Sequence, residues 1–526
     1  MQSDVIIVGG GLAGIMAAFS AQAEGVEVLL IDRGSIGVGT NSILAGGGFA
    51  SPTSTYGPDA YIKDTLQVGK MINHEPRVKL VAQEAPGAID FLRSFGLNLM
   101  ESAEHYFLKS PRSDVIPGVT LMKKLAEKIK DLDRVEILNS FYVTEILKQD
   151  GQVSGVRGLD KSGRKLSIYA PSVVMATGGG GAIYLRNDNQ KRMMGQGYYL
   201  AAKAGLGLWD MEFVQFYPLV MADPRLPSMM LYPFYPKEAK IINASGEDIG
   251  RKHGMGDVNE AIMKKRDALS AVLFEEGSAG PIYMDYRKVP ASGWKTYPLS
   301  LLTKIKYDFR TRPVAISPGA HFFMGGVRTD ESGQTSLPGL FACGEVVWGL
   351  HGANRRGGNA LTECLVLGTL AGKNAAVHSG FQHPAPFKPK ESEASLPNKP
   401  PADKNLRDLS RRLKETAWNY AGVVRTEQGI KTGMKELELL DRQLETNDPS
   451  AIPERILKED LMSASFILKA ILTASLARAE SRGSFNRTDF PREDNVNWQK
   501  NSCLIYDRKK KGFSLSHHPV VAPIGK

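Results

Sequence analysis

A glycine pattern near the start of the chain is the first feature that indicates chemistry. Gly9, Gly11 and Gly14 follow an apolar run at residues 5–8 and precede a stretch of helical composition. Gly9 allows a tight turn, Gly11 lets the backbone approach a pyrophosphate, and Gly14 lets a helix pack closely on a strand. Asp32 ends the next apolar run, where a carboxylate can bind ribose hydroxyls. The pattern predicts a dinucleotide site at a helix N-terminus.

Glycine-rich segments far along the chain, where a ligand could approach the backbone, indicate which dinucleotide the predicted site binds. Ala176 and Thr177 end an apolar run before four glycines, and Gly344 and Glu345 end another. A discontinuous second set of this kind suits FAD, a long molecule that lies through its domain. Residues 40–48, TNSILAGGG, add small and polar side chains that could contact an isoalloxazine ring. The sequence therefore favours FAD over NAD.

The elements that must position these residues alternate between strands and helices. Short β-branched and apolar runs predict buried strands at residues 5–8, 26–31, 172–175 and 339–345. Helices are expected at residues 12–24, over most of 50–135 and from about 359, and residues 136–175 alternate like strands. Proline, lysine and serine dominate residues 384–404, which predicts an exposed linker, and residues 405–480 have a mostly helical pattern.

Composition excludes several classes of protein. The 526 residues suffice for two to four domains, and 66 basic against 56 acidic residues give a net charge of +10, more typical of solubility than of nucleic-acid binding. The three cysteines form no Cys-x-x-Cys motif, so no iron–sulfur cluster or c-type haem is expected, and His517–His518 lacks the partners of a metal site. We find no targeting segment and no apolar stretch near ~20 residues, which predicts a cytoplasmic protein without a transmembrane segment.

Five ordered motifs carry a family resemblance. They are DMEFVQF at residues 210–216, HFFMGG at 321–326, HGANRRGGN at 351–359, AWNYAGV at 417–423, and ESRG at 480–483 followed by RTDFP at 487–491. Together they resemble the FAD-dependent oxidoreductases that include succinate dehydrogenase and fumarate reductase flavoprotein subunits, with L-aspartate oxidase and adenylylsulfate reductase as relatives.

The resemblance implies an α/β fold with three parts. We expect a discontinuous Rossmann-like FAD-binding domain at residues 1–218 and 330–383, with an α+β capping domain at 219–329 inserted into it. The linker at 384–404 then leads to a helical C-terminal domain at 405–526.

The resemblance also implies how FAD is held. Asn41 stands where many members carry the histidine that links FAD covalently, and an amide cannot form that bond, so noncovalent FAD is expected. The residues expected to contact it are Gly9, Gly11, Leu12, Ala13, Gly14, Asp32, Arg33, Thr40, Asn41, Ser42, Gly47, Gly48, Val143, Ala176, Thr177, Gly178, Glu345, Asn359, Ala360 and Leu361.

Three residues match the catalytic positions of the family. His321 and Arg355 match positions that hold a substrate carboxylate beside the flavin, and a guanidinium suits that role because it binds carboxylate bidentately. Arg266 matches the proton donor of fumarate reductases. Independently, Arg266 shares a helical face with Ile262 and Leu269, so it needs a structural carboxylate or a substrate anion as partner, unless it reaches solvent from the edge of that face.

Departures from the family pattern bear on the substrate. Tyr217 replaces a histidine that helps grip a second carboxylate, and Gln196 replaces the aspartate of a GDG turn. A downstream threonine–glutamate pair and an arginine are absent, and residues 232–239, YPFYPKEA, stand about there. The site loses cationic and hydroxyl groups and gains aromatic rings. Reductases of arylacrylate-type acids, which also lack a second carboxylate grip, are therefore a branch to consider.

Three functions stay open at this point. The first is hydride transfer between flavin N5 and a C=C or C–C bond next to a carboxylate or carbonyl, with a substrate other than fumarate, catalysed by Arg266, His321, Arg355 and Tyr217. The second is an amino-acid oxidase similar to L-aspartate oxidase. The third is a flavoprotein that transfers electrons within a larger redox complex. Because no cluster or haem is expected, the partner would be an external electron carrier or an iron–sulfur subunit.

Overall fold

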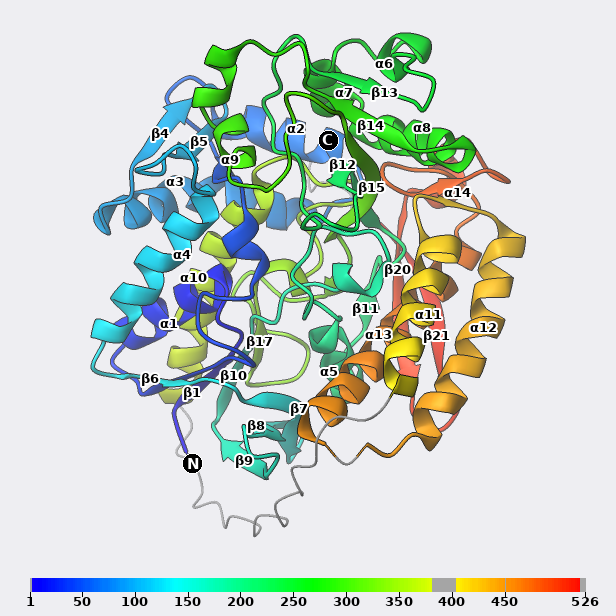
Figure 1. Cartoon of the computed structure of the whole chain (residues 1–526). Helices are drawn as coiled ribbons and strands as arrows, with labels where there is room; N and C mark the ends of the chain where they lie inside the picture. Colours follow the sequence, from blue (N-terminus) through cyan, green and yellow to red (C-terminus); the bar gives the residue numbers. More distant parts are fainter. Residues whose placement is uncertain (1, 381–403, 450, 521–526) are drawn as a thin grey trace.

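The computed structural model describes residues 2–380, 404–449 and 451–520 (Figure 1). Almost all of the predicted linker lies outside the described residues. At the centre is a parallel sheet with strand order β17-β10-β1-β2-β6. Its strands are β1 (Val5–Val8), β2 (Val28–Ile31), β6 (Val135–Leu138), β10 (Ser172–Met175) and β17 (Leu340–Ala342). The four predicted strands are all present in this sheet, and β1, β2, β10 and β17 are buried along their whole length, as expected of parallel strands covered on both faces.

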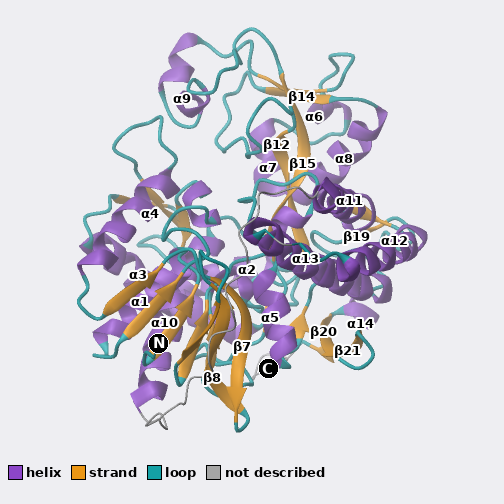
Figure 2. Cartoon of the chain, turned by 60° about the horizontal axis from the view of Figure 1, so that its bottom comes forward, coloured by secondary structure: helices purple, strands orange, loops and turns teal. Residues whose placement is uncertain are grey.

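Helices α1 (Leu12–Ala23) and α10 (Asn359–Gly380) cover one face of the sheet, and α3 (Glu75–Ser94) packs on α10 (Figure 2). Glycines let α1 and α10 touch backbone to backbone. A Cβ on Gly372 would lie 2.1 Å from the Ala17 carbonyl oxygen, and one on Gly368 would lie 2.5 Å from that of Ala13. The contact sets the position of both helix N-termini at the carboxyl edge of the sheet.

Smaller elements complete this part of the chain. The antiparallel sheet β7-β8-β9 (Tyr142–Gln149, Gln152–Leu159, Lys165–Tyr169) contacts β10 through β8. The region from residue 50 to 135, expected to be helical, instead begins with β3 (Gly48–Ala50) and also contains β4 (Leu99–Ser102) and β5 (His105–Leu108), which pair with each other between the helices. The other elements here are α2 (Pro58–Val68), α4 (Pro117–Lys128), α5 (Gln196–Ala204), η1 (Asn41–Leu44), η3 (Gly181–Ile183) and η5 (Gly344–Val346).

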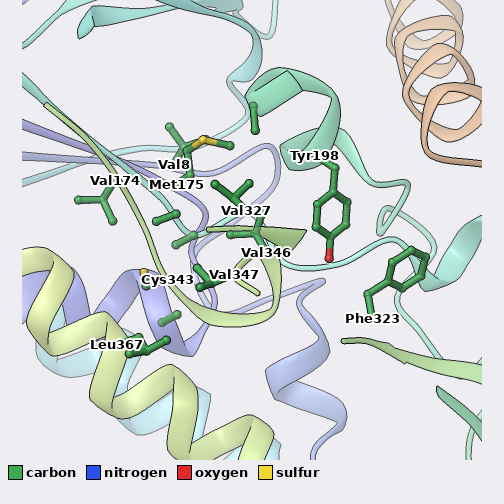
Figure 3. Packing of buried hydrophobic residues seen from close by; sticks show 14 of the residues in the cluster. Val8, Val174, Met175, Tyr198, Phe323, Val327, Cys343, Val346, Val347 and Leu367 are labelled. Carbon is green, nitrogen blue, oxygen red and sulfur yellow. The ribbon is translucent and has the colours of Figure 1, made fainter. Parts of the chain in front are cut away.

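Side chains from several of these elements pack below the carboxyl edge of the sheet. Figure 3 shows Val8, Val174 and Met175 from the sheet beside Val346 and Val347. The ring of Tyr198 stacks on that of Phe323 with centroids 5.8 Å apart, and its hydroxyl donates to the Glu345 carbonyl at 3.0 Å (Figure 3). This packing fixes the position of the segments at the carboxyl edge of the sheet.

The inserted region has its own sheet and core. Strands β12 (Val214–Met221), β15 (Val314–Phe323), β14 (Ile282–Asp285) and β13 (Lys240–Ile242) form it in that order, with α8 (Arg266–Ala279) packed on β12 and β15. Helices α6 (Ile249–Lys252), α7 (Val258–Lys264) and α9 (Leu299–Leu302) complete it. The expectation of a single helical face around Arg266 is wrong, because the helix breaks at Lys265. Arg266 is the first residue of α8 and is half-buried.

The C-terminal region contains three long helices, α11 (Lys404–Ala421), α12 (Glu427–Thr446) and α13 (Ile452–Ala477). It also contains an unpredicted β-hairpin, β20 (Lys500–Asp507) and β21 (Gly512–Pro519), whose first strand pairs with β11 (Leu208–Trp209) beside β16 (Gly326–Val327). Short elements β18 (Val424–Arg425), β19 (Asn486–Arg487) and α14 (Asn495–Trp498) lie between. By length and composition α13 could cross a membrane, contrary to the expectation from the sequence, but most of it is buried against α5, α11 and α12.

A buried ionic network ties this region to the rest of the chain. It consists of Glu212, Arg478, Glu480 and Arg482, all at most 2% exposed. Arg478 contacts both Glu212 and Glu480 at 2.8 Å, and Arg482 contacts Glu480 at 2.8 Å. Ser502 of β20 donates to the second oxygen of Glu212 at 2.7 Å, so every charge in the buried ionic network has a partner.

The close contact of α1 and α10 predicts a position-specific effect of alanine. Gly372→Ala should lower the free energy of unfolding by about 2–3 kcal/mol, because the new Cβ overlaps the α1 backbone. Gly380→Ala is the matched control at the end of the same helix, where a Cβ meets nothing within 4 Å, and it should change stability by less than about 0.5 kcal/mol. Urea unfolding of both variants measures the difference; equal effects would contradict the packing argument.

Candidate functional site

A single cavity of about 1350 Å³ contains most of the predicted residues. It runs from the carboxyl edge of the parallel sheet to the inserted region. Among the predicted cofactor contacts, those that line it are Gly9, Gly11, Leu12, Ala13, Asp32, Arg33, Thr40, Asn41, Ser42, Gly47, Gly48, Val143, Ala176, Thr177, Gly178, Glu345, Ala360 and Leu361. The four predicted catalytic residues, Tyr217, Arg266, His321 and Arg355, line it as well.

The glycine pattern forms a cradle at the N-terminus of α1. Gly9 has a φ of +120°, and a Cβ there would lie 2.2 Å from the Ala176 carbonyl oxygen. A Cβ on Gly14 would lie 1.8 Å from the Gly9 carbonyl oxygen, so Gly14 serves packing and does not line the cavity. At Gly11 the nearest atom to a Cβ is 3.6 Å away, which leaves open space for a phosphate beside the helix N-terminus.

The carboxylate of Asp32 organises the loop around the cradle. Its two oxygens accept hydrogen bonds from the Gly10 amide at 2.8 Å and the Gly34 amide at 2.6 Å. Burial raises the pKa of Asp32 despite these bonds. Neighbouring Arg33 is held by Asp460 at 2.6 Å and lies over the ring of Tyr142. Since a carboxylate oxygen has two lone pairs, Asp32 can still accept a bond from a ribose hydroxyl.

Unpartnered polar atoms mark the middle of the cavity. The hydroxyls of Thr40 and Thr177 are buried without a hydrogen-bond partner, and both residues line the cavity. Buried polar groups are normally bonded, so these two fit a bound polar molecule. Asn41 donates to Asn189 at 2.6 Å and accepts from the Gln190 amide at 3.0 Å, which fixes its amide beside them. The residues present therefore fit a long dinucleotide.

The N-terminus of α10 supplies a second helix end. Ala360 and Leu361 face the cavity, whereas Asn359 does not line it: its side chain accepts from Tyr61 at 2.9 Å and donates to Thr65 at 3.4 Å. Asn359 therefore positions the helix rather than contacting a ligand. On η5, burial raises the pKa of the Glu345 carboxyl to about 7, and the Phe323 amide donates to it at 3.2 Å.

Two adjacent arginines dominate the other part of the cavity. The Nε of Arg355 donates to Gln215 at 3.0 Å, and Arg266 donates to the Arg355 carbonyl at 2.6 Å. Burial, and then the charge of Arg266, lower the pKa of Arg355 to about 9. The Nε of Arg266 is buried without a partner. An anion bound here would relieve both the desolvation and the repulsion of the pair, so the arrangement can bind a carboxylate.

His321 lies next to these arginines and forms an ion pair that the sequence did not reveal. Its Nδ1 donates to Asp188 at 2.8 Å, and its ring lies 5.5 Å from that of Tyr217. Asp188 sits in an Asn-Asp-Asn stretch that matches no motif, and only its spatial position shows its importance.

Aromatic rings form another wall of the cavity. The Tyr217 hydroxyl lies 2.8 Å from that of Tyr235 and 3.3 Å from the Leu231 carbonyl, so its hydrogen bonds are made inside the inserted region. Tyr232 donates to the Leu44 carbonyl at 2.6 Å, which joins this wall to the other side of the cavity. Sequence reasoning missed three further lining residues here: Phe107, Tyr297 and Arg356. Phe107 lies edge-on to Phe234.

Two other residues discussed from the sequence lie at the margins. Gln196 lines the cavity and donates to the Val143 carbonyl. Lys237, the basic residue of the 232–239 segment, is exposed and does not line the cavity. It supplies no charge to the aromatic wall in this structure.

Comparisons with known proteins agree with this geometry. The FAD binding domain family matches residues 4–361, and the fumarate reductase flavoprotein C-terminal family matches residues 410–524. One subunit of the CoM/CoB fumarate reductase of Methanothermobacter marburgensis is 29% identical over 96% of this chain and 97% of its own. L-aspartate oxidase of Agrobacterium fabrum is 30% identical over 93% of this chain and 91% of its own.

A solved structure shares the fold. The E. coli quinol fumarate reductase chain superposes with a TM-score of 0.87 over 100% of this chain and 98% of its own, at 23% identity. The expected α/β fold, with FAD-binding, capping and C-terminal helical domains, is therefore confirmed. FAD as the cofactor is confirmed as well. The chain belongs to the FAD-dependent oxidoreductase family of the succinate dehydrogenase and fumarate reductase flavoproteins.

Proposed function

We propose that this oxidoreductase catalyses hydride transfer between FAD and a C=C or C–C bond next to the carboxylate of a mono-acid, and that fumarate is not its substrate. The observation that carries the proposal is the polarity of the cavity. Arg266 and Arg355 line one part of it, and aromatic rings line another part, where the hydroxyls of Tyr217, Tyr232 and Tyr235 are bonded within the protein. The Tyr297 hydroxyl in this wall is buried without a partner. One carboxylate has two adjacent cationic partners there, whereas a second one at the Tyr217 wall meets neutral hydroxyls.

The roles follow from the contacts. Arg355 binds the carboxylate, with His321 beside it, because Gln215 fixes the guanidinium while one edge faces the cavity. Arg266 supplies the proton to the carbon next to the one that receives hydride, and its Nε, which is buried without a partner, is one donor for this. The bound FAD supplies the redox chemistry, and the protein supplies orientation and charge. The ring of Tyr217 stacks on the substrate, since its hydroxyl is directed elsewhere.

An amino-acid oxidase is the second candidate, because a relative at 30% identity is an L-aspartate oxidase. A primary amine beside the carboxylate would need an acceptor, and the buried Asp188 next to His321 is a carboxylate that could serve. Turnover with aspartate and oxygen separates this candidate from the first.

We also propose that electrons reach FAD from a separate carrier protein or an iron–sulfur subunit. One relative carries the name of a subunit. Cys343, Cys364 and Cys503 are separate free thiols, and the described part of the chain holds no group of three or more residues that could bind a metal.

Noncovalent attachment of FAD is the first prediction from this site. Asn41 offers an amide that bonds Asn189 and Gln190, so no bond to the flavin can form there. Precipitating the purified protein with acid should release all yellow colour into the supernatant. Colour that stays with the washed precipitate would show a covalent link and contradict the prediction.

Substrate preference is the second prediction. With reduced viologen as electron donor, aryl- or alkyl-substituted acrylates should have a kcat/KM at least about tenfold above that of fumarate, because an unpaired buried carboxylate costs several kcal/mol. Steady-state kinetics on a matched series of acids measures this. A fumarate kcat/KM above that of every mono-acid, and lost in Tyr217→Phe, would overturn the proposal.

Dependence on an external carrier is the third prediction. Metal analysis of the purified chain should find no stoichiometric iron, and NADH alone should support no rapid turnover, whereas an artificial one-electron donor should. Steady turnover with NADH as the sole donor would argue against a dedicated partner.

A further inference from the structure

Asp188 is a buried carboxylate inside the substrate part of the cavity. It lies in the loop between η3 and α5, and its side chain is 3% exposed. Its backbone amide donates to the Ala320 carbonyl at 3.3 Å, and Asn187 forms a bridge with Ala320, so the loop is fixed against β15 directly before His321. Among the described residues, the only ion-pair partner of Asp188 is His321.

The pair changes what His321 can contribute. Because Nδ1 donates to Asp188, only Nε2 is left for a ligand. A protonated ring forms a neutral pair with Asp188, and a neutral ring leaves the pair with a charge of −1. In either state the pair adds no net positive charge, so the positive charge next to His321 comes from Arg266 and Arg355. The cavity is also lined by Arg356, Lys70, Lys264 and Lys265.

The position of Asp188 places its charge near the aromatic wall. Its carboxylate acts electrostatically on the phenols of Tyr217 and Tyr232 as well as on the guanidinium of Arg355. A ligand that is held by Arg355 and extends toward Tyr217 therefore meets neutral rings and one negative charge. A second carboxylate would face like charge in a buried setting, which costs several kcal/mol.

We infer that Asp188 determines specificity: its buried charge restricts the site to ligands with a single carboxylate. Asp188 acts on bound ligand through its field and through His321, and it exchanges no proton or electron in this role. The inference deepens the proposed function, because it gives the reason for a mono-acid substrate. The claim that only mono-acids are reduced rests on the proposed function. The claim that only mono-acids bind well does not.

The test compares two ligands that the enzyme cannot reduce. Succinate is the dianion and 3-phenylpropanoate the monoanion, and the dissociation constant of each is measured by calorimetric titration of the FAD-loaded protein with its flavin reduced, where neither saturated acid can exchange hydride. Asp188→Asn removes the charge while keeping an acceptor for His321. It should shift the ratio of the two constants toward succinate by at least about tenfold. Asp188→Ser also removes the charge, and it should shift the ratio in the same direction. The two variants have different side chains, so the comparison can still be made if one of them does not fold.

Two matched variants separate charge from packing. Asp188→Glu keeps the charge and should leave the ratio within about threefold of the wild-type value. Asp64→Asn removes a carboxylate from α2, which lines the same cavity, and should also leave the ratio unchanged. If Asp188→Asn and Asp188→Ser weaken both ligands equally, or leave the ratio unchanged, the inference is wrong.

Kinetics then distinguishes this inference from the proposed function. If no acid is reduced but the binding ratio moves in the two neutral variants, the inference holds and the proposed function fails. If mono-acids are reduced and the ratio does not move, the proposed function holds and the inference fails.

Discussion

The substrate part of the cavity depends on the buried ionic network, which lies outside it. Glu212 belongs to this network and comes two residues before β12, the strand that carries Gln215. The Gln215 side chain accepts from the Arg355 Nε and donates to the Arg355 carbonyl, both at 3.0 Å. The position of the Arg355 guanidinium thus follows from that of Glu212. Losing one partner would leave a buried charge uncompensated, at about 3–5 kcal/mol, and would displace this strand.

The other end of the buried ionic network fixes the loop that carries Arg355. Arg482 precedes Gly483 and Ser484, and the Ser484 amide donates to the Ala353 carbonyl at 3.0 Å. A Cβ on Gly483 would lie 2.5 Å from the same carbonyl oxygen, so this approach requires glycine. Two segments of the site are therefore held by one set of charges. The motifs at residues 210–216 and 480–483 thus position the site, although most of their residues do not line the cavity.

Features set by local backbone geometry could be predicted from the sequence, and features set by distant contacts could not. The spacing of Gly9 and Gly14 between strand and helix follows from how those elements must pack, and the structure places both as expected. Asp188 acts on a histidine 133 residues away, and no local pattern encodes that distance. The break at Lys265 and the hairpin at residues 500–519 were missed for the same reason: helical periodicity continues across the break, and β20 gains its pairing from β11.

The selectivity that we propose for this site is electrostatic. The cavity of about 1350 Å³ includes the cradle for FAD, so its volume does not measure the substrate part. The charges of that part are what would separate a mono-acid from a dicarboxylate. Arg266 and burial together lower the pKa of Arg355 to about 9, and one carboxylate relieves both effects. In addition to the buried Asp267 next to Arg266, Asp188 then places a negative charge beside the ligand. A second anionic group would gain nothing from the bonded hydroxyls of Tyr217 and Tyr235 and would be repelled by this carboxylate.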